Sequence, residues 1–513
     1  MRNLRYIFLL LMSVVLVSCD STLELEPEDF YGINNYWKTP EQCNRFMIGL
    51  HFRMRERAEF RMKMGELRGG TLNTSSSTSI GEGANDIAAV SNNLSEANCV
   101  LSNWCDFYMD IYQINHAIEK IGGGAAPLDE QTRNTYLGQL YGMRAFYYFY
   151  LLRTWGGVPL CDKPDVLHTD GIDVLNKPRS SEQEIWDFIC EDLVRSEECY
   201  ENIGFANYKG KNCYWNKAAT YCLKAEVYMW GAKVKTLDTQ KFFSTDPMHD
   251  LTEAKNALEA LEGRYSLNAQ FKDAFSPFNK DANKETIFAI RYKLGEKGNY
   301  FGNFTYNVAV IGKFLDKDGN KIDNKNALNI ASGAMRYEYS EAFAASFAAE
   351  DNRHDATFYN LYLKDASGEV YVSGRALCKF IGEMDNGKNQ YSNDVPVYRY
   401  ADVLLMLAEI HNDLGNIDQA KYYLKQVRQR AFAGSTAPAI LGVSKEEIEQ
   451  EILDERKKEF VCEGKVWFDI RRMLGAEQAL KLVDNNALKL VWPIDSGVLS
   501  KDTLVEQNKG YAK

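Results

Sequence analysis

The sequence predicts a mainly α-helical fold, built from antiparallel helical hairpins of the tetratricopeptide (TPR) type. Three observations support this prediction. Two amphipathic helices joined by a tight turn occupy 399–432, further amphipathic segments precede and follow them, and a turn-rich stretch interrupts the helical pattern at 264–395. A single helical hairpin cannot bury its apolar face alone, so the helices are expected to stack around a continuous core. Long loops and short β-hairpins are then insertions into the helical stack.

The clearest helical hairpin is the segment 399–432. Gly415 is expected to end its first helix, because glycine adopts the left-handed backbone at little cost. Asn416 and Gln419 form a capping-box pattern at the start of the second helix. Apolar side chains follow helical spacing in both helices, at Val403, Leu407, Ile410 and Leu414 in the first and at Ala420, Leu424, Val427 and Ala431 in the second.

Other helices are predicted by capping residues followed by apolar positions at helical spacing. Trp104 shares the apolar face of one of them and is expected to be a core residue. The predicted helices run from Thr39 to about Arg61, from Ser102, over Gln131–Trp155, from Ser181, over Trp215–Ala232, from Asp250, and from Ser444 through Met473.

The insertion at 264–395 carries the signals of short strands and turns. Hairpins are predicted around Asp318-Gly319 and over Lys364–Ser373. An EF-hand is excluded at the first of these, because Lys321 stands where the calcium loop needs glycine and Ala327 where it needs glutamate.

Composition limits the function. The chain has 513 residues and a net charge of −11, which argues against nucleic acid as a partner. Its 11 cysteines show no CxxC pair and no regular spacing, so mostly free, buried thiols are expected, with no metal site and no cofactor.

The N-terminus has the pattern of a targeting segment. Arg2 and Arg5 precede the apolar run Tyr6–Val17, which is shorter than the roughly 20 residues that cross a bilayer. The run ends in Leu16-Val17-Ser18-Cys19, which resembles a bacterial lipobox. A plain signal peptide is the alternative, but this ending favours a lipoprotein signal peptide over 1–18, with lipid attached to Cys19.

Several charged residues near the C-terminus have catalytic side chains but ordinary helical spacing. Glu455, Arg456, Glu459 and Glu463 recur at i, i+4 intervals. This spacing is typical of ion pairs on a helix surface. The sequence therefore predicts no catalytic residue among them.

An ordered set of motifs spans nearly the whole mature chain behind the lipobox. The motifs are Arg144–Phe149 with Trp155–Leu160, Trp215–Ala219, Arg399–Met406, Val427–Ala431, Glu455–Gly464, Trp492-Pro493-Ile494 and Gln507–Tyr511. Together they resemble the SusD/RagB family of outer-membrane lipoproteins from Bacteroidetes.

This resemblance implies a fold, a location and a function. The fold would be a SusD-like right-handed superhelix of TPR-type repeats in a single domain over 19–513. Its N-terminal part would cover about 20–232, the loop and β insertion about 264–395, and the C-terminal part about 396–513. The protein would be a surface-exposed, lipid-anchored outer-membrane protein that captures oligosaccharides, or peptides as RagB-like members do. It would deliver them to a SusC-like TonB-dependent transporter without catalysis.

Saccharide binding needs exposed aromatic faces and polar groups on loops. The segment Gly298–Tyr306 fits this requirement, with Tyr300, Phe301, Phe304 and Tyr306 among Gly and Asn. The alternative is that part of this set fills the inner face of a strand. The polar loop that begins near Arg68 and Asn73 is the second candidate, although it lacks the tryptophan that starch-type binders of the family use.

Two other functions compete with the binding lipoprotein. A surface glycoside hydrolase needs only a pair of carboxylates, yet the prominent acidic residues have ion-pair spacing, and no GxSxG or HExxH motif occurs. A TPR scaffold for another protein is disfavoured by the lipobox and the long polar insertions.

Overall fold

The structure, a computed structural model, describes residues 36–74, 84–101, 104–124, 126–165 and 176–512. Over these ranges the chain is mainly helical with little sheet, which confirms the predicted fold class. The helices are α2 (Pro40–Glu66), α3 (Ala84–Val90), α4 (Cys105–Gly122), α5 (Glu130–Trp155), α6 (Glu182–Cys199), α7 (Lys217–Lys233), α8 (Pro247–Glu259), α9 (Glu341–Ala344), α10 (Asn352–Thr357), α11 (Tyr400–Asp413), α12 (Ile417–Ala431), α13 (Lys445–Glu459), α14 (Val466–Arg472), α15 (Glu477–Lys481) and α16 (Ser496–Lys501).

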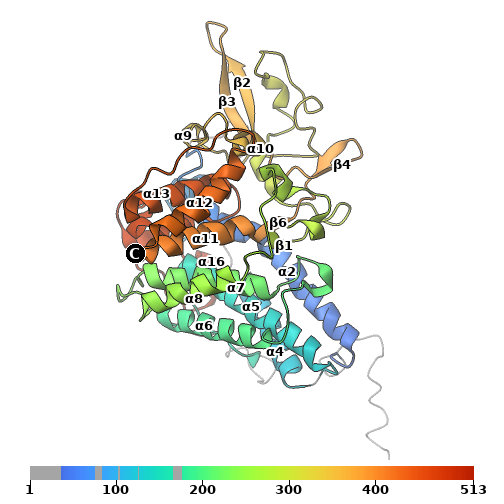
Figure 1. Cartoon of the computed structure of the whole chain (residues 1–513), viewed down its shortest axis with the longest axis vertical. Coiled ribbons are helices and arrows are strands. Elements are labelled where there is room, and N and C mark those ends of the chain that lie inside the picture. Colours follow the sequence, from blue (N-terminus) through green and yellow to red (C-terminus); the bar gives the residue numbers. More distant parts are fainter. Residues whose placement is uncertain (1–35, 75–83, 102–103, 125, 166–175, 513) are drawn as a thin grey trace, which may run out of the picture.

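Consecutive helices pack in pairs, as a stack of helical hairpins requires. The pairs α5–α6, α7–α8 and α11–α12 each share a long contact, and α11 also packs on α8 and α13. Figure 1 shows α4 to α8 as one group of helices, with α11 to α13 beside it. One large hydrophobic core runs through both groups. None of the helices in the described ranges combines the length and apolar character needed to cross a bilayer.

The predicted hairpin at 399–432 is α11 and α12. Gly415 has a φ of +80°, so the left-handed residue expected after the first helix is confirmed. The prediction of a capping box at Asn416 is wrong, because the Asn416 side chain accepts no hydrogen bond from a backbone N–H of the helix. Instead the backbone N–H of Asn416 donates to the carbonyl of His411 at 2.7 Å, which closes the turn.

Most other helix starts agree with the sequence signals. The capping boxes at Thr39 and Ser181 are both formed. Helix α8 begins at Pro247 under an Asp246 cap, one turn before the predicted Asp250. Trp104 is buried, as expected, whereas Ser102 lies outside the described residues.

In the part of the chain that the structure describes, the strands form three antiparallel pairs, and all but the last strand lie in the insertion. The predicted hairpin over 364–373 is confirmed as β2–β3, which projects from the top of the molecule in Figure 1. The Asp318-Gly319 turn is closed by a single bridge between Leu315 and Lys321. The strands are β1 (Thr286–Ile290), β2 (Phe358–Lys364), β3 (Val370–Leu377), β4 (Glu383–Asp385), β5 (Lys388–Gln390) and β6 (Val395–Arg399); β1 pairs with β6 and β4 with β5.

The single long helix predicted from Ser444 through Met473 is wrong, because the chain breaks between α13 and α14. Cys462 and Gly464 both have positive φ, +61° and +72°. Their backbone N–H groups donate to the buried carboxylate of Glu66 on α2, each at 3.1 Å. The break therefore provides two hydrogen bonds to a buried carboxylate that would otherwise accept from the Tyr339 hydroxyl alone.

The ion pairs predicted on a helix surface are instead buried and connect distant segments. Arg399, only 1% exposed, donates to Glu285 at 2.8 Å and to Glu463 at 2.9 Å, and also to Glu459. We name this set the Arg399 cluster. It joins α13 and the following turn to α10, α12, the end of β6 and the residues next to β1 and β3. Its members are Glu285, Arg353, Lys379, Arg399, Arg430, Glu455, Glu459 and Glu463.

Charge pairing keeps Glu459 and Glu463 of this cluster ionised. Burial alone would raise the pKa of Glu459, but the guanidinium groups of Arg430, Arg399 and Arg353 hold it below the ordinary value. Arg399 and Lys379 lower the pKa of Glu463 in the same way, against the effect of burial. The cluster is therefore a structural ion network.

All ten cysteines in the described ranges are free thiols, as predicted. The prediction that most of them are buried is wrong, because only Cys43, Cys99, Cys222 and Cys462 are buried. Burial raises the pKa of Cys99 to about 12. Such thiols behave as small apolar core residues.

Candidate ligand-binding site

The segment predicted to stack on sugars places most of its rings in the core. Phe301 and Phe304 are each 1% exposed. Phe301 stacks on Phe380 with ring centroids 4.0 Å apart, and Phe304 packs against Tyr337 at 5.1 Å. Because other rings cover these faces, neither phenylalanine presents a surface to a ligand in this structure.

Tyr306 is buried as well, in a smaller core under the β2–β3 hairpin. Its hydroxyl donates to Asn324 at 2.8 Å and accepts from the N–H of Leu328 at 3.0 Å. Tyr300 is only half-buried, although its ring packs 4.5 Å from that of Phe301. The prediction of ligand contact in this segment therefore narrows to Tyr300.

Arg68 anchors the C-terminal segment instead of facing solvent. Its guanidinium lies 4.2 Å from the ring centre of Trp467 and donates to the carbonyls of Lys489 at 2.6 Å and Val491 at 3.0 Å. Burial lowers the pKa of Arg68 to about 10, so it is still charged at neutral pH. This residue packs the chain terminus onto α14.

The structure brings the two predicted segments together through a third one. The backbone N–H of Asn73 donates to the carbonyl of Glu338 at 2.7 Å. Tyr337, one residue earlier, donates its N–H to the carbonyl of Asn303 at 3.1 Å. The segment 334–340 thus lies between the loop after α2 and the 3₁₀ turn Phe301–Phe304.

Polar side chains gather where these segments meet. Arg336 is 52% exposed and lies 4.0 Å from Asp86 on α3. Asn303 donates to Glu59 on α2 at 3.2 Å. We name Glu59, Asn73, Asp86, Asn303 and Arg336 the polar face. Arg336 is exposed, Glu59, Asn73 and Asn303 are half-buried, and Asp86 is buried. The amide, guanidinium and carboxylate groups that remain accessible are of the kind that hold sugar hydroxyls.

Sequence reasoning did not single out Arg336. One signal in the sequence could have found it, because Arg336 stands between the apolar residues Met335 and Tyr337, both of which the structure buries. This alternation is typical of an extended segment with one face exposed. The contacts of Arg336 with α3 could not be read from the sequence.

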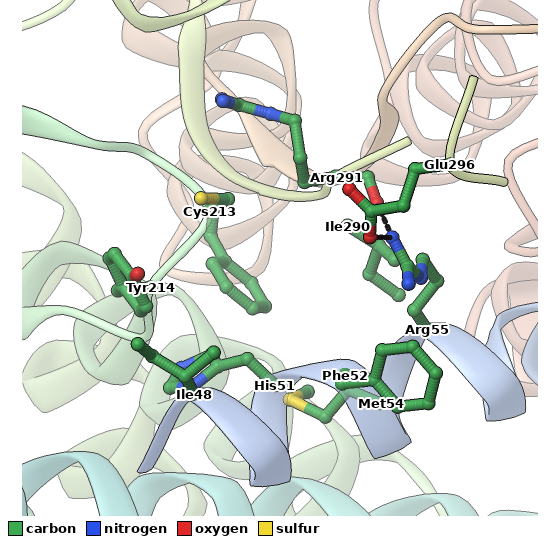
Figure 2. A pocket seen from close by; sticks show the side chains of 11 residues that line it. Ile48, His51, Phe52, Met54, Arg55, Cys213, Tyr214, Ile290, Arg291 and Glu296 are labelled. Carbon is green, nitrogen blue, oxygen red and sulfur yellow. Dashed lines mark hydrogen bonds and ion pairs between the residues drawn. The ribbon is translucent and has the colours of Figure 1, made fainter. Parts of the chain in front are cut away.

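A small pocket lies further along α2 (Figure 2). It is about 140 Å³ in volume, and its lining includes Ile48 and Phe52 of α2 and Ile290 of β1. At its edge Arg55 forms an ion pair with Glu296 at 2.7 Å, drawn as a dashed line in Figure 2. This volume is below the 300–1,000 Å³ of typical small-molecule sites, so the pocket fits one apolar group beside a cation.

His51 at this pocket is a satisfied structural residue. Its Nε2 accepts from the backbone N–H of Trp215 at 2.9 Å, and its Nδ1 lies 2.8 Å from the carbonyl of Met47. Burial lowers the pKa of His51 to about 4, so the ring is neutral at physiological pH. Within the described ranges, no group of three or more His, Cys, Asp and Glu side chains could hold a metal ion.

The fold and this polar face define a helical-repeat protein with hydrogen-bonding side chains gathered beside α2. Comparison with known proteins gives its relatives. The model of the SusD family matches residues 360–511, and a second one, described as "Starch-binding associating with outer membrane", matches residues 53–229. A solved SusD superfamily protein from Bacteroides fragilis is 35% identical, with a TM-score of 0.83, over 93% of this chain and 100% of that one.

The chain therefore belongs to the SusD family. SusD-like protein P38 of Formosa agariphila is 27% identical over 99% of both chains. A more distant structure, described as a laminarin binding SusD-like protein, is 18% identical, covers 93% of this chain and 100% of its own, and has a TM-score of 0.70. That last similarity shows the shared fold alone.

Proposed function

We propose that this protein is a surface lipoprotein that captures oligosaccharides and passes them to a SusC-like TonB-dependent transporter in the outer membrane. The observation that carries the proposal is full-length membership of the SusD family, together with a lipobox at Cys19, which lies outside the described residues. The family description "Starch-binding associating with outer membrane" and the laminarin-binding neighbour support a glycan as the ligand class.

The proposed capture site is the polar face, extended along α2 to Tyr300 and the small pocket. Its polar groups are held by backbone pairing before any ligand arrives, and a preformed site loses little entropy on binding. Absence of catalysis is supported by the Arg399 cluster, since Glu455, Glu459 and Glu463 are buried and paired with cations. A general acid needs a raised pKa and access to substrate.

The test is binding without turnover. The chain from residue 20 is titrated with a panel of oligosaccharides and peptides, and the mixture is assayed for new reducing ends. Binding of a glycan with no released sugar supports the proposal. Released sugar refutes the non-catalytic assignment, and binding of peptides alone favours the RagB-like alternative.

The site is tested with Asn73→Ala/Arg336→Ala, which should weaken glycan binding at least tenfold without changing the melting temperature. The matched control is Lys313→Ala/Lys317→Ala, two exposed positions outside the polar face. The anchor is tested in cells, where Cys19→Ala should remove the protein from the outer-membrane fraction and abolish its co-purification with the transporter.

A further inference from the structure

An open groove, apart from the small pocket on α2, lies between α12 and the loop 432–440. Its volume is about 890 Å³, which is within the range of sites for drug-sized ligands. It shares no lining residue with the small pocket on α2 and none with the polar face. The resemblance to SusD proteins singled out Val427–Ala431 on this helix but assigned nothing to its outer surface.

The walls of this groove are fixed in place by hydrogen bonds from neighbouring elements. Arg428 of α12 donates to the carbonyl of Ala439 at 3.3 Å. Asn352 of α10 donates to the carbonyl of Ala433 at 2.9 Å. Phe432 is buried beneath the loop. The groove is therefore formed before a ligand enters it.

An aromatic face and polar groups line the groove. Tyr422 is 57% exposed, and its ring is braced edge-on by Tyr423 at a centroid distance of 5.2 Å. Lys421, Lys425 and Gln429 follow on one stripe of α12 at i, i+4 and i+8. Ser435 and Thr436 in the facing loop are exposed. An exposed ring with amide and hydroxyl groups around it suits a sugar.

The charge of the groove points to an anion. Neither Lys421 nor Lys425 forms an ion pair with another residue in the described ranges. Arg428, by contrast, is neutralised by Glu451 and Glu455, each at 2.9 Å. Two uncompensated ammonium groups therefore line a groove of a chain whose net charge is −11.

We propose that this groove binds an anionic oligosaccharide, one that carries uronate or sulfate groups, as a second saccharide site apart from the polar face. The ring of Tyr422 stacks on the C–H face of one sugar, and Lys421 and Lys425 hold its anionic substituents. The inference rests on the proposed function for the ligand class and adds to it a site and a charge preference.

The test compares hexagalacturonate with its methyl ester, and a heparin hexasaccharide with its desulfated, N-acetylated and carboxyl-reduced form, by calorimetry on the chain from residue 20. At least one anionic member should bind tenfold or more tightly than its neutral partner, with affinity falling as salt rises. Tyr422→Ala and Lys421→Ala/Lys425→Ala should each weaken that binding about tenfold. Tyr371→Ala, an aromatic 46% exposed on β3, and Lys313→Ala/Lys317→Ala are the matched controls and should leave it unchanged.

Two results overturn this inference separately from the proposed function. Equal binding of anionic and neutral partners removes the charge preference. Anionic binding that is lost in Asn73→Ala/Arg336→Ala but kept in both groove variants assigns the ligand to the polar face alone. If neither these glycans nor any oligosaccharide in the wider panel binds, the proposed function fails together with the inference.

Discussion

Arg399→Met should destabilise the folded chain by about 3–5 kcal/mol, the cost of removing one partner from a buried ion pair. The structure sets this expectation, because Arg399 bridges Glu285, Glu459 and Glu463 in a site closed to solvent. Methionine preserves much of the volume but none of the charge. The cations left beside these carboxylates are Arg430, Lys379 and Arg353. They cannot neutralise all three, because Arg353 also pairs with Asp351 and Glu455.

Urea denaturation followed by circular dichroism measures this change at neutral pH. Lys481→Met is the control, because Lys481 pairs with Glu477 at 2.7 Å on an exposed surface, where no measurable change is expected. A loss below about 1 kcal/mol in Arg399→Met would refute the reasoning, since it would mean that the cluster behaves like ordinary surface ion pairs. Ligand affinity should stay within twofold, because Arg399 is buried away from the polar face.

Two further predictions concern α2 and α6. Gly65→Ala should lower the free energy of unfolding by about 1–3 kcal/mol or more, because its Cβ would lie 1.8 Å from the carbonyl oxygen of Gly464. Gly49→Ala is the control on the same helix, since its Cβ meets no atom within 4 Å, and it should stabilise the fold by about 0.5–1 kcal/mol. Thermal unfolding measures both changes. Burial raises the pKa of Glu182 from 4.5 to about 7, so the folded state binds more protons between these pH values and wild-type stability falls as pH rises through them. The free energy of unfolding of Glu182→Gln, relative to that of the wild type, should therefore rise by at most about 3 kcal/mol from pH 5 to pH 8 in urea titrations. If the two proteins differ in this free energy by the same amount at both pH values, the prediction is wrong.

The helical stack could be predicted because its signals are local. The apolar spacing and the left-handed Gly415 of the 399–432 hairpin, and the capping boxes at Thr39 and Ser181, depend on residues a few positions apart. The break between α13 and α14 could not be predicted, because its cause is Glu66, far away in the sequence. Gly464 is a local signal of the same kind as Gly415, but apolar residues at helical spacing continue beyond it and favoured an unbroken helix.

The same distinction explains the candidate site. The sequence identified two segments with suitable side chains, but exposure is a property of the packed chain. Phe301 and Phe304 lie against rings from residues 337 to 380, so they are core, although their glycine-rich surroundings suggested a loop. Asn73 and Arg336 reach the same surface only because residues 334–340 pair with both segments. The prediction that Glu455, Glu459 and Glu463 form surface ion pairs is wrong for a related reason, since i, i+4 spacing does not show whether a helix face is covered by other elements.

One buried connection links the polar face to the helical stack. Tyr339, three residues after Arg336, donates its hydroxyl to Glu66 at 2.7 Å. Glu66 in turn holds the turn that joins α13 to α14. The groups proposed to meet the ligand are thus fixed through hydrogen bonds to the most buried part of the fold. Such rigidity favours capture, because a surface that is ordered before binding spends little of the contact energy on ordering itself.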